Sequence, residues 1–72
     1  MATATDHPFS YKVEPHTRRH KGQFFWIVLE HGRVKRTSFF KRPYETRHLA
    51  AAAGYEEMLK LATKWRNRGQ GQ

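Results

Sequence analysis

The sequence predicts a small α+β domain of order β-β-β-α, in which a three-stranded antiparallel sheet (a meander) carries one C-terminal helix on one face. Three segments rich in aromatic and β-branched residues are separated by turn residues, and one alanine-rich segment follows them. A chain of 72 residues has room for one thin core, such as a sheet with a single helix laid on it, and not for a deep pocket as well.

The first two strands are expected over residues 9–13 and 23–30. In the first, Phe9, Tyr11 and Val13 alternate with polar residues, which is typical of a strand with one apolar face. Pro15 ends this strand because proline has no N–H to donate to a ladder. The second contains an unbroken apolar run over 24–29, whose aromatic and β-branched content favours a central strand.

A two-residue hairpin turn at His31-Gly32 is expected to lead into a third strand over residues 33–40. This turn would set Val28 opposite Lys35 and Ile27 opposite Arg36. The face expected to meet the helix then carries Phe25, Ile27, Leu29 and Val34. The open face carries Phe24, Trp26, Val28 and Phe39 among Arg33, Lys35 and Thr37. This register puts Arg36 on the helix side. Either Arg36 lies at the sheet edge with its guanidinium in water, or the true register differs from this one. A turn that is one residue longer or shorter would move every side chain of the third strand to the opposite face.

The helix is expected to begin after Thr46, a good N-cap residue. Its core-facing stripe is predicted from helical periodicity as His48, Ala51, Ala52, Tyr55, Leu59 and Ala62, with Met58 and Trp65 at its edge. Gly54 either marks a close approach to the sheet or is simply tolerated at a cost of about 1 kcal/mol.

The organisation expected along the chain is a disordered arm over 1–7, the domain over 8–65 and a disordered basic tail over 66–72. The first residues lack the basic and apolar regions of a signal peptide, and the longest apolar run, 24–29, is far shorter than the roughly 20 residues of a membrane span. We therefore expect a cytoplasmic protein with no membrane partner.

The charge is the strongest indication of function. Fourteen Lys and Arg against six Asp and Glu give a net charge of +8, which attracts polyanions. Basic loops are expected on both sides of the open sheet face, where cations would contact phosphates while rings pack or stack. The predicted nucleic-acid-binding residues are Arg18, Arg19, Lys21, Trp26, Arg33, Lys35, Arg36, Lys41 and Arg42.

We therefore expect a nucleic-acid-binding module, with DNA expected in preference to RNA. The alternative is a protein–protein interaction module, in which the open aromatic face forms a homodimer or meets an acidic protein.

The sequence offers no catalytic constellation, and we expect neither an enzyme nor a cofactor. The absence of cysteine excludes disulfides, thiolate metal sites and a cysteine nucleophile. His16 and His20 have the spacing of metal ligands on a helix, but they fall in a predicted basic loop, whose cations disfavour a metal ion. Glu56 and Glu57 are adjacent on the expected helix, so their carboxylates point about 100° apart and do not converge.

The order of elements, with Tyr11-Lys12-Val13, Phe25-Trp26-Ile27 and Lys35-Arg36-Thr37 on the strands, resembles the three-stranded DNA-binding domains of the AP2 type and the arm-binding modules of tyrosine recombinases. Phe40 and the segment 46–55 complete the match, which spans about residues 9–62. The resemblance implies a sheet that enters the major groove, with Trp26, Arg33 and Lys35 as contacts, and Arg36 if the register allows.

Two departures leave the docking mode of that family open. The Arg-Gly-Val-Arg-like opening is absent, and the connection over 40–46 is longer and contains Pro43. A looser resemblance, carried by Trp26, Gly32, Ser38, Tyr44 and Ala50, is to small bacterial β-β-β-α domains of unknown function.

Overall fold

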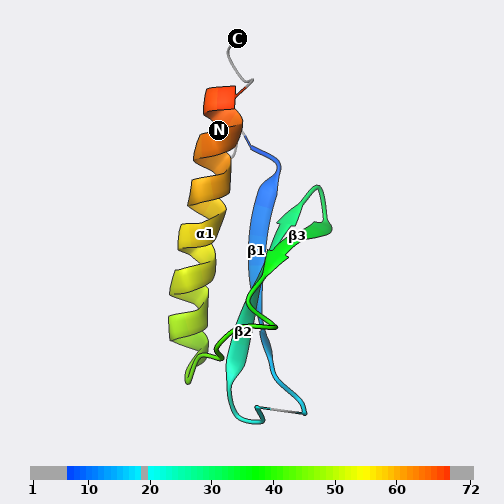
Figure 1. The fold of residues 1–72 in the computed structure, drawn as a ribbon, viewed down its shortest axis with the longest axis vertical. Helices are drawn as coiled ribbons and strands as arrows, with labels where there is room; N and C mark the ends of the chain where they lie inside the picture. The colour runs from blue at the N-terminus through cyan, green and yellow to red at the C-terminus, as the bar shows by residue number, and fades with distance from the viewer. Residues whose placement is uncertain (1–6, 19, 69–72) are drawn as a thin grey trace, which may run out of the picture.

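The computed structural model describes residues 7–18 and 20–68 and has the predicted β-β-β-α order (Figure 1). Strands β1 (Phe9–Pro15), β2 (Phe24–Glu30) and β3 (Arg33–Thr37) form one antiparallel sheet in the order β1-β2-β3, and helix α1 (Arg47–Arg68) follows. The helix packs on β1 and β2, and β3 lies beyond its edge. The predicted fold class is confirmed. In the described residues, no helix is both long and apolar enough to cross a membrane.

The β2–β3 turn has the predicted length. His31 and Gly32 both have left-handed backbones, with φ of 53° and 82°, as a two-residue turn of the primed type requires. Glu30 pairs with Arg33 and Leu29 with Val34, so the predicted register is confirmed beside the turn.

One residue further from the turn, a β-bulge changes this register. Lys35 has no partner in the ladder, Arg36 pairs with Val28, and Thr37 pairs with Ile27. The predicted pairs of Val28 with Lys35 and of Ile27 with Arg36 are therefore wrong, because one extra residue on β3 shifts every later pair by one. Strand β3 is also shorter than predicted and ends at Thr37.

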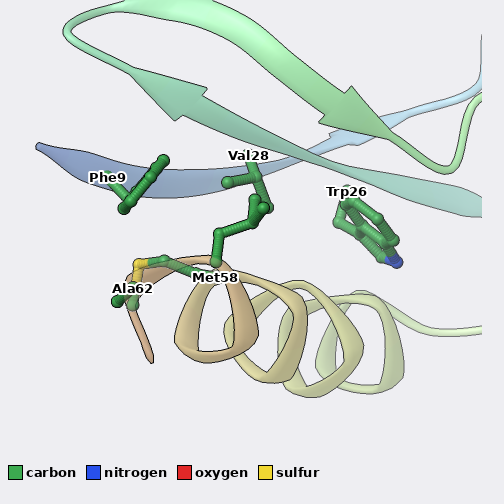
Figure 2. Packing of buried hydrophobic residues seen from close by; sticks show 6 residues of the cluster. Phe9, Trp26, Val28, Met58 and Ala62 are labelled. Carbon is green, nitrogen blue, oxygen red and sulfur yellow. The ribbon is translucent and has the colours of Figure 1, made fainter. Parts of the chain in front are cut away.

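The two faces of β2 are the reverse of those predicted. Val13 pairs with Trp26 and Tyr11 with Val28, so the alternating apolar face of β1 shares its side with Trp26 and Val28. Both side chains point from β2 toward α1 and are buried (Figure 2). The open side of β2 instead carries Phe25, Ile27 and Leu29.

The core lies between this face and the helix (Figure 2). Its buried members are Phe9, Trp26, Val28, Met58, Leu61 and Ala62. Gly54 is buried directly against Trp26, and a β-carbon at that position would lie 2.8 Å from the Trp26 β-carbon. Of the two interpretations of Gly54, the close approach to the sheet is the one that the structure bears out.

The buried face of α1 differs from the predicted stripe. His48, Ala52, Tyr55 and Leu59 are exposed, whereas Ala50, Gly54 and Leu61 are buried. Thr46 caps the helix as predicted, because its Oγ1 accepts a hydrogen bond of 3.1 Å from the Leu49 N–H. The helix continues to Arg68, so the first residues of the expected tail are helical, while 69–72 and the arm residues 1–6 lie outside the described residues.

Candidate functional site

The β3–α1 loop is fastened to the start of β2. Tyr44 forms a two-way backbone bridge with Phe24: the Phe24 N–H donates to the Tyr44 carbonyl at 2.8 Å, and the Tyr44 N–H donates back at 3.0 Å. The guanidinium of Arg47 lies over the Phe24 ring, 5.1 Å from its centroid. The far end of this loop is therefore held on the strand edge before the helix begins.

The near end of the loop is fastened by the buried side chain of Ser38. The Trp26 N–H donates to Ser38 Oγ at 3.0 Å, and the Ser38 N–H donates to the Trp26 carbonyl at 3.1 Å. The Trp26 indole N–H also donates to the Tyr44 hydroxyl at 3.3 Å. Hydrogen bonds to Trp26 thus hold both ends of the loop against the core, and the segment between Ser38 and Tyr44 projects from it.

This projecting segment forms a tight turn, in which the Lys41 N–H donates a hydrogen bond of 2.9 Å to the Ser38 carbonyl. It presents two consecutive aromatic side chains, Phe39 and Phe40, which are 43% and 86% exposed. An almost fully exposed phenylalanine on a loop fixed at both ends is a surface ring held in place, and not part of the core.

The β1–β2 loop closes on itself beside this segment. The His16 N–H donates to the Gln23 carbonyl at 2.8 Å, and the Gln23 N–H donates to the His20 carbonyl at 2.9 Å. The loop thereby folds the His16 side chain inward, where it is only 5% exposed.

Five rings from the two loops and β2 form a contiguous group that we call the ring cluster: His16, His20, Phe25, Phe39 and Phe40. His16 is at its centre, with its ring centroid 5.1 Å from that of His20, 4.8 Å from that of Phe25 and 5.2 Å from that of Phe39. Phe39 stands edge-to-face against Phe25 at 4.9 Å and against Phe40 at 4.9 Å. Edge-to-face contacts are favourable because the positive edge of one ring meets the negative face of the other. The contacts join the buried and the exposed rings of the cluster in one continuous series.

His16 is the electrostatically unusual member of the cluster. Burial lowers the pKa of its imidazole from the ordinary value of 6.5, and the neighbouring His20 lowers it further. Its Nε2 is buried without a hydrogen-bond partner in the described part of the chain, so no described group stabilises a proton there.

A cavity of about 470 Å³ opens over the exposed side of the cluster. We call it the loop cavity. Among the described residues, its lining contains two cations, Arg18 and Lys41, and no carboxylate. Neither cation makes an ion pair within residues 7–18 and 20–68. The residues that line it are His16, Thr17, Arg18, His20, Phe39, Phe40 and Lys41.

The predicted site residues fall into separate places. Arg18 and Lys41 meet in the loop cavity, and Lys21 and Arg42 are exposed on the same two loops. Arg19 lies outside the described residues. The placement of Trp26 on the open face is wrong: it is 6% exposed and packs against Gly54 of the helix.

The three predicted cations of β3 lie away from this cavity. The register puts Arg33 and Arg36 on the side of Glu30 and Val28, which is the helix side of the sheet. Arg36 forms a 2.7 Å ion pair with Glu57 of α1, and Lys35 lies 3.5 Å from Glu30. The expected grouping of Arg33 and Lys35 with aromatic rings on the open face is therefore wrong, whereas Arg36 lies on the helix side of the sheet as expected.

Four residues of the cavity were not predicted as part of a site, namely His16, Thr17, His20 and Phe40. Phe40 was placed at the end of a strand, and His16 was considered only as a metal ligand. A signal for both was present in the sequence, because each lies within a few residues of cations in a predicted loop. Among the described residues, no group of three or more potential metal ligands occurs.

Searches of protein-family models, of curated proteins and of solved structures found no match to this chain. The resemblance to three-stranded DNA-binding domains accordingly stays a prediction.

Proposed function

We propose that this protein is a nucleic-acid-binding module and that its contact surface is centred on the loop cavity. The observation that carries the proposal is that the exposed Phe39 and Phe40 rings line one cavity together with Arg18 and Lys41, and that no described carboxylate lines it. Cations that contact phosphates, interleaved with rings on which bases stack, are the elements of nucleic-acid grooves.

The open face of the sheet extends this surface toward the hairpin turn. By its pairing with Ile27, Lys12 lies on this face, where its Nζ is 3.6 Å from Glu14 Oε2, and Leu29 and Val34 pair on the same side. Lys21 and Arg42 add exposed cations on the two loops. The net charge of +8 supports the same class of partner, because its field raises the local concentration of a polyanion. DNA is the nucleic acid we propose first.

The test is fluorescence anisotropy of labelled oligonucleotides at low salt and at about 150 mM salt. We expect binding that persists at the higher salt. Replacing both Arg18 and Lys41 by Ala should weaken it and should flatten the slope of log K against log salt by roughly 1.4–1.8, since each lost phosphate contact contributes about 0.7 to 0.9.

The matched control is the double variant Lys60→Ala with Lys64→Ala. Both lysines are exposed on α1, and this change removes the same amount of charge from a different surface. Equal losses in the two double variants would show that only net charge matters, and the proposal would fail. A complete loss of parent binding at about 150 mM salt would contradict it as well.

A further inference from the structure

The loop cavity also indicates the form of nucleic acid that fits it. We infer that it holds an unpaired nucleotide of a single strand, with the base stacked on Phe40 and the adjoining phosphate between Arg18 and Lys41. This inference rests on the proposed function and adds to it the strandedness of the ligand and the residue that recognises the base.

The exposure of Phe40 is the first step. At 86% exposed it is the most exposed of the large apolar side chains described, and it is neither at a chain end nor in a long loop. Its neighbour Phe39 stands edge-to-face against it at an interplanar angle of 85°. Phe39 is itself packed on Phe25 and His16. Phe40 therefore rests on a supported ring and leaves most of its own surface to a partner.

The chemistry of the cavity selects the partner. A stacking platform beside two cations that have no ion pair among the described residues fits a ligand that combines a planar ring with an anion, which is the chemistry of a nucleotide. The cavity volume of about 470 Å³ lies within the roughly 300–1,000 Å³ of small-molecule sites. A peptide of acidic residues alone would satisfy Arg18 and Lys41 but has no ring system to cover Phe40.

The same chemistry argues against a duplex. In a double helix each base face is covered by its neighbours, so a ring held on a protein surface meets a free face only in single strands, loops and ends. The loop that carries Phe40 is fixed at both ends by the Ser38 and Tyr44 hydrogen bonds, so the ring is presented in one place.

The experiment measures anisotropy with an oligothymidylate of about 12 nucleotides and with a blunt duplex of equal length, at about 150 mM salt. We expect the single strand to bind more tightly. Phe40→Ala should weaken the single strand about tenfold or more, the usual effect of removing one stacked ring, and should leave the weaker duplex binding unchanged. Phe40→Trp should restore single-strand binding.

A direct readout of stacking uses 2-aminopurine in place of one thymine. Its fluorescence should be quenched on binding to the parent protein and to Phe40→Trp, and much less on binding to Phe40→Ala. Leu59→Ala is the matched control, because it removes an exposed apolar side chain of α1, outside the loop cavity and the open sheet face, and should change neither affinity nor quenching. Circular dichroism confirms that the variants are folded.

The outcomes separate the two proposals. If neither oligonucleotide binds at about 150 mM salt, the proposed function itself is overturned. If both bind equally, or if Phe40→Ala weakens the duplex as much as the single strand, the protein binds nucleic acid but the inference is wrong. Competition by poly-glutamate as effective as that of the oligonucleotide would likewise overturn the inference in favour of an acidic protein partner.

Discussion

His16 is buried among rings at the point where the two loops meet, and no described carboxylate lines the cavity beside it. The other polar groups of the same cavity are Thr17, Arg18, His20 and Lys41, none of which stabilises an imidazolium ion. Burial and the neighbouring His20 lower the pKa of His16. The folded protein therefore holds this imidazole in its neutral form.

A pH dependence of stability follows from this shift. In the unfolded chain His16 titrates at its ordinary value of 6.5, so below that pH the unfolded state binds more protons than the folded state does. Stability should therefore be at its full value above the ordinary pKa and should fall as the pH drops toward the lower pKa of the folded state. Urea midpoints compared at about pH 7.5 and about pH 5 measure the effect.

The control for this prediction is His16→Phe, which keeps a flat ring against Phe25 and Phe39 but cannot titrate. Its stability should depend less on pH than that of the parent. An identical pH dependence in the two proteins would assign the effect to other groups, such as the remaining histidines.

At the scale of elements, the contact of α1 with the sheet is decided by one pair of residues. The helix can pack close to the sheet because Gly54, which faces Trp26, has no side chain. This pair also explains the rotated face of α1. Apolar residues such as Leu49, Tyr55 and Leu59 occur on the exposed side of the helix as well, so periodicity could not select the buried face. The contact between the small Gly54 and the large Trp26 selects the face of α1 that is buried.

Gly54→Ala should therefore destabilise the fold, although alanine is the better helix former. The added β-carbon would lie 2.8 Å from the Trp26 β-carbon, which is rigidly attached to β2. Overpacking of this kind costs about 1–3 kcal/mol, which exceeds the gain of about 1 kcal/mol in helix propensity. Denaturant unfolding gives the net effect.

The helix propensity can be measured separately with Ala52→Gly, since Ala52 is exposed on the same helix. That variant should lose about 1 kcal/mol from propensity alone. If Gly54→Ala were instead more stable than the parent by a similar amount, the close helix–sheet contact described above would be incorrect.

The elements and their order were predictable because each has a local signal: alternation in β1, the turn at His31-Gly32, and the Thr46 cap. The face of the sheet that meets the helix was not predictable. It depends on how β1 pairs with β2, and the sequence of the loop between these strands does not determine that register. The bulge at Lys35 adds a second uncertainty, since one unpaired residue exchanges the sides of everything after it. Of the site, the cations that lie in loops, Arg18 and Lys41, were predicted.

At the scale of the whole molecule, a net charge of +8 is combined with an open sheet face that is partly apolar. Val34 on this face is 63% exposed and pairs with Leu29, which leaves homodimerisation as the alternative use of the face. Charge separates the two uses. Two copies that each carry +8 repel one another, and salt screens that repulsion, whereas salt weakens phosphate contacts through counterion release.

We expect the protein to sediment as a monomer over a wide range of protein concentration, at low salt and at about 150 mM salt, while its affinity for nucleic acid falls as salt rises. Val34→Lys should not change the sedimentation of the protein, and it should not weaken single-strand binding because it adds a cation. A dimer that strengthens with salt and is lost in Val34→Lys would make the open face a homodimer interface. Since the loop cavity lies at the other end of the sheet, single-strand binding measured on the same variant would then decide whether both surfaces are used.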